Sequence, residues 1–146
     1  MTMKRILTLA SLSLLMLTSI GCKKEGCTDI AAINYENSAN KDNGSCIFEG
    51  EAVLWYDQSS SQSFLFSGIS SLKFYVDETL VGSTDASVYW TNAPECGENG
   101  SITVTKELGN SKSKTFTYKV ENNFGTIVES GILNISANSC EAIKIY

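Results

Sequence analysis

The feature that most constrains the fold is a strict alternation of apolar and polar residues in the second half of the chain. In residues 115–121, Phe116, Tyr118 and Val120 fall on one face, with threonine and lysine on the other, and residues 101–108 alternate in the same way. A period of two places successive side chains on opposite faces of a β-strand. Further segments rich in strand-forming residues lie at 52–56, 72–76, 79–83, 126–136 and 140–146. We expect strands throughout this region and no helix, since no window repeats apolar residues at helical spacing.

These segments predict an all-β domain over residues 51–146, an antiparallel β-sandwich of seven or eight short strands. The "DE" at 77–78 predicts a tight strand connection, and "GNSKS" at 109–113 predicts a hairpin between its flanking strands. The alternation slips near Gly131, which predicts a β-bulge there. The stretch "SLKFYVDETLVGS" at 71–83 resembles a hairpin of bacterial Ig-like modules, and this resemblance implies an Ig-like sandwich. The Cys–Trp–Cys spacing of immunoglobulin domains is absent, so the strand order stays open.

The first 21 residues predict a cleaved export signal. Lys4 and Arg5 precede an apolar run from Ile6 to Ile20, which has the length of a signal-peptide core and is short for a membrane-spanning helix. An uncleaved N-terminal anchor helix is the alternative.

The residues "SIGC", which end at Cys22, resemble the lipobox of bacterial lipoproteins. The resemblance implies cleavage before Cys22 and a diacylglyceryl group on its thiol, although Ser19 stands where the lipobox usually has leucine. Acyl chains on Cys22 would then make the contact with the membrane, and residues 22–26 would form a lipidated tether. The "KKE" at 23–25 resembles the export signals of some surface lipoproteins; a simple solvated tether is the alternative.

Five cysteines are an odd number for an exported chain, and acylation of Cys22 would leave four for disulfides. Four cysteines allow three pairings. We favour Cys27–Cys46 and Cys96–Cys140, because each pair brackets a segment of distinct composition. A zinc site is the competing interpretation, but the chain has no histidine and lacks the cysteine spacing that zinc sites use.

The segment 27–46 predicts a small, disulfide-bracketed module rich in Asn and Asp. With Gly26 it reads "GCTDIAAINYENSANKDNGSC", which resembles a short module of exported Bacteroidota proteins. Calcium is one hypothesis here, because side-chain oxygens are the ligands it prefers. Such residues more often bond their own backbone in turns. The candidate calcium ligands are Asp29, Asn34, Asp42 and Asn43.

The whole arrangement of lipobox, tether, module and β-domain resembles a group of small Bacteroidota lipoproteins. This resemblance implies a lipid-anchored protein of the bacterial outer membrane, on its periplasmic or cell-surface face. Removing residues 1–21 takes away Lys4 and Arg5 and no acid, so the net charge falls from −5 to −7. That charge argues against nucleic acid and anionic lipid surfaces as direct partners.

The residue inventory argues against an enzyme. Without histidine the chain cannot form Ser–His or Cys–His nucleophile pairs, and it has no glycine-rich phosphate loop between a strand and a helix. Glu95 and Glu98 could serve as a glycosidase pair only across a sugar-binding cleft. We expect them in a solvated loop, and we expect no cofactor apart from the possible Ca²⁺.

Aromatic residues are numerous and provide the main binding hypothesis. Exposed tyrosine and tryptophan side chains bind sugars and protein partners well, and Tyr75, Tyr89 and Trp90 are the candidates. The alternative places Trp55 and Trp90 in the core and Tyr75 in an ordinary cross-strand pair. The chain is therefore predicted to be a non-enzymatic, lipid-anchored envelope protein with a binding or structural β-sandwich. A glycan-binding surface lipoprotein and a calcium-stabilised tether are the alternatives.

Overall fold

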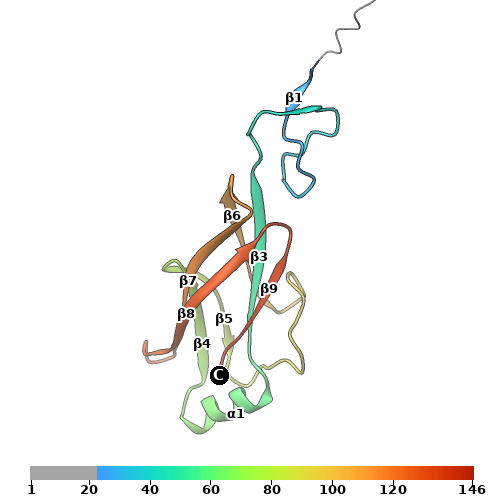
Figure 1. Ribbon diagram of the computed structural model, residues 1–146. Helices are drawn as coiled ribbons and strands as arrows, with labels where there is room; N and C mark the ends of the chain where they lie inside the picture. Colours follow the sequence, from blue (N-terminus) through green and yellow to red (C-terminus); the bar gives the residue numbers. More distant parts are fainter. Residues whose placement is uncertain (1–22) are drawn as a thin grey trace, which may run out of the picture.

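The computed structural model describes residues 23–146 and shows an elongated molecule (Figure 1). A small module containing β1 (Glu25–Gly26) occupies one end, and helix α1 (Gln58–Phe66) occupies the other. The predicted signal peptide and the predicted lipidation site Cys22 lie outside the described residues. Between residues 23 and 146, no helix has the length and apolar character needed to cross a bilayer.

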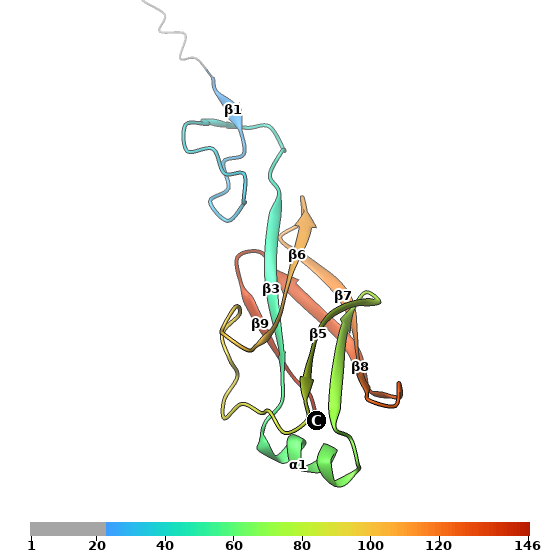
Figure 2. The same ribbon diagram turned by 180° about the vertical axis from the view of Figure 1, so that it is seen from behind.

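Two sheets pack on each other as a β-sandwich, which confirms the predicted all-β fold class. Figures 1 and 2 show the sheets from opposite sides. The three-stranded sheet has the order β6 (Ile102–Gly109), β3 (Phe48–Trp55), β9 (Cys140–Lys144). The four-stranded sheet has the order β5 (Thr79–Asp85), β4 (Ser71–Val76), β7 (Ser113–Asn122), β8 (Ile127–Ser136). The first strand, β3, begins before the predicted domain boundary at residue 51.

The core lies between the sheets and follows the alternation of the sequence. Leu72, Phe74 and Val76 of β4 are fully buried, as are Leu133 and Ile135 of β8. Burying one such side chain contributes about 1.5–3 kcal/mol to folding. The polar residues between them face outward, which confirms the face assignments made from the sequence.

The strand pairing departs from the predicted antiparallel arrangement in one place. Strand β3 is antiparallel to β6 but parallel to β9, with Glu51 opposite Cys140 and Trp55 opposite Lys144. The first and last strands of the sandwich are therefore neighbours. This order of strands differs from that of an immunoglobulin constant domain.

One predicted strand connection is wrong and one is confirmed. The segment 109–113 does not close a hairpin, because β6 and β7 belong to different sheets and the chain crosses between them here. The "DE" connection does join β4 to β5 tightly. Asp77 and Glu78 have φ values of 46° and 62°, and a type I′ turn requires positive φ at both of its central residues.

The predicted bulge near Gly131 is also wrong in its position. Gly131 pairs regularly with Tyr118, and the register of β7 and β8 shifts nearer the turn, where Val128 has no opposite residue. The slip in the apolar pattern at Gly131 has a steric cause instead. A Cβ atom there would lie 2.8 Å from Cε1 of Tyr118, so glycine makes room for the tyrosine ring.

Helix α1 contradicts the expectation of an all-strand region. Its buried residues are Ser60, Ser61 and Phe64, so only one of them is strongly apolar and the sequence shows no apolar stripe. The signals that mark it are at its ends. Asp57 caps the first turn by accepting a hydrogen bond from the Ser60 N–H at 3.0 Å, and Gly68, with φ of +76°, follows the last turn.

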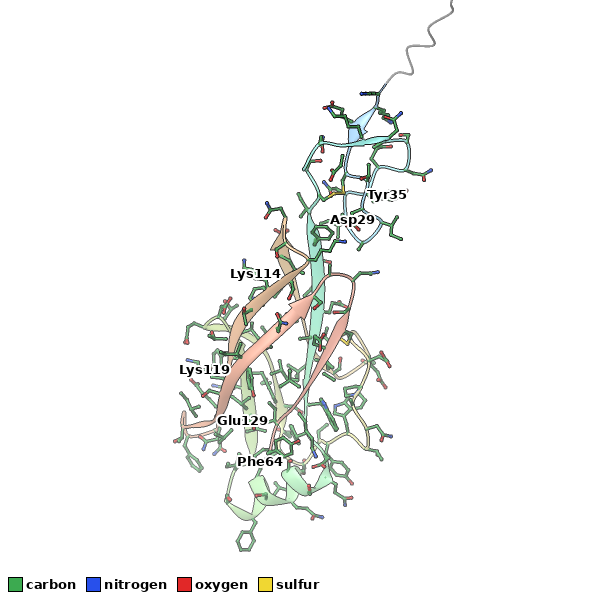
Figure 3. The ribbon with its side chains drawn as sticks, in the orientation of Figure 1. Asp29, Tyr35, Phe64, Lys114, Lys119 and Glu129 are labelled. Carbon is green, nitrogen blue, oxygen red and sulfur yellow. A yellow bond between two sulfur atoms is a disulfide. The ribbon has the colours of Figure 1, made fainter. Side chains whose placement is uncertain are left out.

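The N-terminal module is closed by the Cys27–Cys46 disulfide, and the sandwich contains the Cys96–Cys140 disulfide, so both favoured pairings are confirmed. In the module β1 pairs in parallel with β2 (Lys41–Asp42). The ammonium group of Lys112 lies 2.5 Å from the Asp29 carboxylate and 5.7 Å from the centre of the Phe48 ring. Lys112 thereby links the module to the sandwich, and Figure 3 shows Asp29 on the module.

Candidate binding groove beside helix α1

A groove of about 420 Å³ lies beside α1, at the end of the molecule opposite the N-terminal module. One wall comes from the start of α1 and its cap, and the other from the irregular connection between β5 and β6. The volume falls within the range of about 300–1,000 Å³ that is typical of small-molecule pockets. The lining residues are Asp57, Gln58, Ser59, Gln62, Tyr89, Trp90 and Thr91.

The helix wall is oriented by contacts on the opposite face of α1. The Phe64 ring meets the Tyr56 ring edge to face, with 5.4 Å between their centroids, and Figure 3 shows Phe64 at this end of the sandwich. The Ser61 hydroxyl donates a hydrogen bond of 2.6 Å to the carbonyl of Ala86. With this face fixed, Gln58 and Gln62, which lie one helical turn apart on the other side, are held toward the groove.

The second wall has no regular secondary structure and is held by a few specific bonds. The backbone N–H of Trp90 donates to the Tyr56 carbonyl at 3.0 Å, and the backbone N–H of Ala86 donates to the Ser70 carbonyl at 2.9 Å. Farther along the same connection, Cys96 is bonded to Cys140 at the start of β9. Tyr89 and Trp90 are therefore positioned beside α1 by bonds at both ends of their segment.

The groove has one carboxylate, and a lysine neutralises it. The Lys144 ammonium lies 2.6 Å from Oδ2 of Asp57, while Oδ1 of Asp57 accepts hydrogen bonds from the Ser60 N–H and the Ser59 hydroxyl. The hydrogen bond from Lys144 is the main reason that the pKa of Asp57 lies well below its usual range. The same bond raises the pKa of Lys144. Both groups stay charged around neutral pH, and their charges cancel.

Several polar groups of the lining have no hydrogen-bond partner among residues 23–146. They are the side-chain amides of Gln58 and Gln62, the Tyr89 hydroxyl and the Trp90 indole N–H. Each amide offers two donors and two acceptor sites, and each aromatic ring offers an apolar face. Tyr89 is 43% exposed. The groove thus combines aromatic surface with solvent-accessible, neutral hydrogen-bonding groups that no other described residue engages.

The three candidate ligand-binding residues do not form one site. Tyr89 and Trp90 line the groove together, whereas Tyr75 lies on the outer face of the four-stranded sheet, between buried neighbours on β4. The Lys119 ammonium lies 5.0 Å from the centre of the Tyr75 ring. Partial burial, followed by a hydrogen bond to Glu121, raises the pKa of Tyr75. Its surroundings are those of the cross-strand pair that formed the alternative interpretation.

The other aromatic and acidic candidates are separated as well. Neither Trp55 nor Trp90 is buried, so their interpretation as core residues is wrong, while Tyr56 is buried and donates to the Asp85 carbonyl at 2.8 Å. The Glu98 carboxylate accepts a hydrogen bond from the Glu95 backbone N–H at 3.0 Å. That contact belongs to the turn that precedes β6, outside the groove beside α1.

The side-chain oxygens of the four candidate calcium ligands are engaged by backbone N–H groups and, for Asp29, also by Lys112 of the sandwich. Asp29, Asp42 and Asn43 each accept a hydrogen bond of 3.0 Å from the backbone N–H two residues on. The Asn34 amide nitrogen donates to the Ser45 carbonyl at 2.6 Å, and its oxygen accepts a hydrogen bond from the Ile47 N–H at 2.8 Å. The Lys112 ammonium and the local backbone bond lower the pKa of Asp29. No cluster of three or more metal-ligating Asp, Glu, Cys or His residues occurs between residues 23 and 146, and calcium binding stays a prediction.

A larger groove, of about 580 Å³, lies between the module and the sandwich. Ile30 and Ile33 line its module side, and Glu49, Glu51 and Glu95 line its sandwich side. Its lining contains three carboxylates but no lysine, arginine or aromatic ring. We take the smaller groove as the candidate site, because it alone of the two brings aromatic surface and free amide groups together.

Comparisons of the chain with family models, with curated proteins and with solved structures found no match.

Proposed function

We propose that this chain is a non-enzymatic, lipid-anchored envelope protein whose β-sandwich is a binding module, with the groove beside α1 as its ligand site. The observation that carries the proposal is the placement of two features at opposite ends. Strand β1 starts at Glu25, three positions after Cys22 in the sequence, and the groove lies at the far end of the elongated molecule (Figure 1). A chain attached through Cys22 would hold the groove away from the membrane.

The way the groove is built supports a binding role. Its walls are fixed before any ligand arrives, by the Asp57–Lys144 ion pair, the Ser61–Ala86 hydrogen bond and the Trp90–Tyr56 backbone bond. A pre-formed site loses less conformational entropy when it binds. The groups left free are those that contact ligands, while the groups that hold the walls are all paired.

The chemistry of the groove supports a non-enzymatic role. Its single carboxylate, Asp57, is engaged by Lys144 and by two further donors, which leaves it poorly suited to transfer protons. A glycosidase needs a second carboxylate across the cleft, and the other groove-lining residues are amides, hydroxyls and aromatics.

Two measurements test the proposed lipid anchor. The intact mass of the chain extracted from membranes should correspond to a start at Cys22 with added acyl mass, and reduction should add four hydrogens for two disulfides. Cys22→Ser should release the protein from the membrane fraction. An unacylated N-terminus in the membrane-extracted protein would overturn the anchor.

The binding role is tested with the full chain carrying Cys22→Ser, added to envelope fragments from which the native protein has been removed. We expect saturable binding that Trp90→Ala weakens and that Tyr35→Ala, at an exposed aromatic residue of the distant module (Figure 3), leaves intact. Binding that is absent, or equally strong in both variants, would remove the groove as the ligand site.

A further inference from the structure

Resting on the proposed function, we propose that the groove beside α1 binds an uncharged oligosaccharide, with a sugar ring stacked on Trp90 or Tyr89 and its hydroxyls bonded by Gln58 and Gln62. The aromatic surface of the groove, its amide groups and its charge each favour such a ligand.

The aromatic surface of the groove suits a sugar ring. Trp90 and Tyr89 are adjacent in the sequence and both line the groove, and both stay outside the apolar core. A sugar ring presents C–H groups on its faces and hydroxyls around its edge. An aromatic ring with a polar tip matches that pattern, because its face accepts the C–H groups and its N–H or O–H reaches the hydroxyls.

The helix wall of the groove presents two glutamine side chains. Gln58 and Gln62 are four residues apart on α1, so their Cβ atoms are about 5–6 Å apart on one helix face. Both amides are without partners among residues 23–146 and line the groove opposite the aromatic segment. A hydroxyl group both donates and accepts hydrogen bonds, and so does an amide, which makes these groups suited to a row of hydroxyls.

The charges in and around the groove favour an uncharged ligand. The Asp57 carboxylate is 2.6 Å from the Lys144 ammonium, so the groove has no unpaired cation to attract an acidic polymer and no free carboxylate to attract a basic one. The Lys144 ammonium is further shielded, since it lies 4.8 Å from the centre of the Tyr146 ring and 5.8 Å from that of Trp55. With a chain net charge of −5, anionic polysaccharides are repelled as well. An uncharged saccharide meets no such penalty.

The test uses the full chain, purified from membranes in detergent. It is titrated with cellohexaose, xylohexaose, mannohexaose and maltohexaose, and with polygalacturonate as the anionic probe, followed by tryptophan fluorescence and calorimetry. We expect at least one neutral hexasaccharide to bind saturably and polygalacturonate not to bind. Trp90→Ala and Gln62→Ala should each weaken that binding about tenfold or more, which corresponds to loss of one well-formed contact.

Tyr35→Ala serves as the matched control, because Tyr35 is an exposed aromatic residue of the module at the opposite end of the molecule (Figure 3), and it should change the affinity less than twofold. Trp90→Phe keeps an aromatic face and should restore most of the affinity lost in Trp90→Ala. Thermal melting of each variant separates loss of a contact from loss of the fold, and Gln62→Ala, on an exposed helix face, should melt like the unmodified chain.

The outcomes separate this inference from the proposed function. If no neutral hexasaccharide binds while envelope fragments still bind through Trp90, the ligand is of another class, such as a peptide, and the saccharide inference is overturned. Preferential binding of polygalacturonate would overturn the argument from charge. Saccharide binding that survives Trp90→Ala would place the sugar site elsewhere, and loss of both kinds of binding would remove the proposed function as well.

Discussion

The ammonium group of Lys144 lies 2.6 Å from Oδ2 of Asp57, which joins the last strand of the sandwich to the residue that caps helix α1. The two residues are 87 positions apart in the sequence. A partly exposed ion pair contributes little to stability by itself. Its consequence is geometric: one oxygen of Asp57 caps the helix while the other is held by β9, so one side chain fixes the groove wall in two directions.

The two roles of Asp57 can be separated by mutation. Asp57→Ala removes both the cap and the ion pair, and we expect the melting temperature to fall by about 4–8 °C, since loss of an N-cap typically has an effect of this size in a domain this small. Asp57→Asn keeps a capping oxygen and loses only the ion pair, so its melting temperature should fall by less than half as much. Calorimetry or circular dichroism measures both. Equal losses in the two variants would contradict the division of roles.

The ion pair also predicts the response of stability to acid. Lys144 holds the pKa of Asp57 below its ordinary value of 3.8. Because the folded pKa is lower than the unfolded one, the stabilisation is complete above about pH 4 and is lost as the pH falls through the folded value. Lys144→Met should therefore reduce the dependence of the unfolding free energy on pH below 4. Urea unfolding at pH 7, 4, 3 and 2 measures this dependence.

Asp29 provides an internal comparison for the acid experiment, because Lys112 lowers its pKa in the same direction. Lys112→Met removes the partner of Asp29 in the module, so it should reduce the dependence of the unfolding free energy on pH below 4. It should leave saccharide or envelope binding unchanged. If neither lysine variant alters the acid dependence, other carboxylates control it.

The two disulfides are expected to act on different properties. Cys96 and Cys140 are 44 positions apart, and Cys27 and Cys46 are 19 apart. Loop-closure entropy gives the longer crosslink about 4 kcal/mol and the shorter about 3 kcal/mol. Each double Cys→Ser variant should lower the free energy of unfolding in urea by up to that amount.

Only the longer crosslink tethers the connection that carries Tyr89 and Trp90. Replacing Cys96 and Cys140 should therefore weaken ligand binding to the groove, and replacing Cys27 and Cys46 should not. A loss of binding in the Cys27/Cys46 variant alone would instead indicate a site at the module.

The sequence predicted most of the sandwich because its strands carry their own signal. Phe116, Tyr118 and Val120 alternate with polar residues, and the structure places them on the inner side of β7 as expected. The disulfide pairs were predictable because cysteines are few and bracket distinct segments. These features depend on local patterns, so the sequence alone is enough to predict them.

The parts that the sequence did not predict depend on contacts between distant residues. Helix α1 is buried through Ser60, Ser61 and Phe64, and hydroxyls give no apolar periodicity. The crossing between sheets at 109–113 has the turn residues of a hairpin, and only the pairing of β6 with β3 distinguishes the two. Of the residues that line the groove, the sequence indicates Tyr89 and Trp90 as candidates. It does not indicate Gln58 and Gln62, because they belong to the helix that the apolar pattern does not show.

Among the glycines between residues 23 and 146, Gly50 is the one where an added Cβ atom would lie nearest to another atom, and this predicts a strong steric effect. A Cβ atom at Gly50 would lie 2.2 Å from the Ser136 carbonyl oxygen, where the end of β8 passes over β3. Because a backbone atom is in the way, Gly50→Ala should destabilise the sandwich by at least about 1–3 kcal/mol. Gly82→Ala is the matched control, since its Cβ would meet the flexible end of Ile102 at 2.8 Å. In urea unfolding, the free energy of unfolding of Gly50→Ala should be well below that of Gly82→Ala. The reverse order would contradict this packing.

The buried tyrosine under the groove predicts a loss of stability in alkali. Burial raises the pKa of Tyr56 to about 12 from an ordinary value of 10.0. Its hydroxyl also donates to the Asp85 carbonyl at 2.8 Å. Since the folded pKa is the higher one, this stabilisation is complete below pH 10 and is lost as the pH rises toward 12.

Tyr56→Phe removes both the hydrogen bond and the titrating group. At pH 8 the variant should unfold with a free energy lower by about 1 kcal/mol, the usual contribution of one hydrogen bond. Between pH 10 and 12 the difference should shrink, because ionisation of Tyr56 favours unfolding in the unmodified chain alone, whereas Tyr118, whose pKa is also raised to about 12, is present in both proteins. Urea unfolding of both proteins at pH 8, 10 and 11 follows the difference directly. A difference that stays constant across that range would mean that Tyr56 does not titrate with a raised pKa.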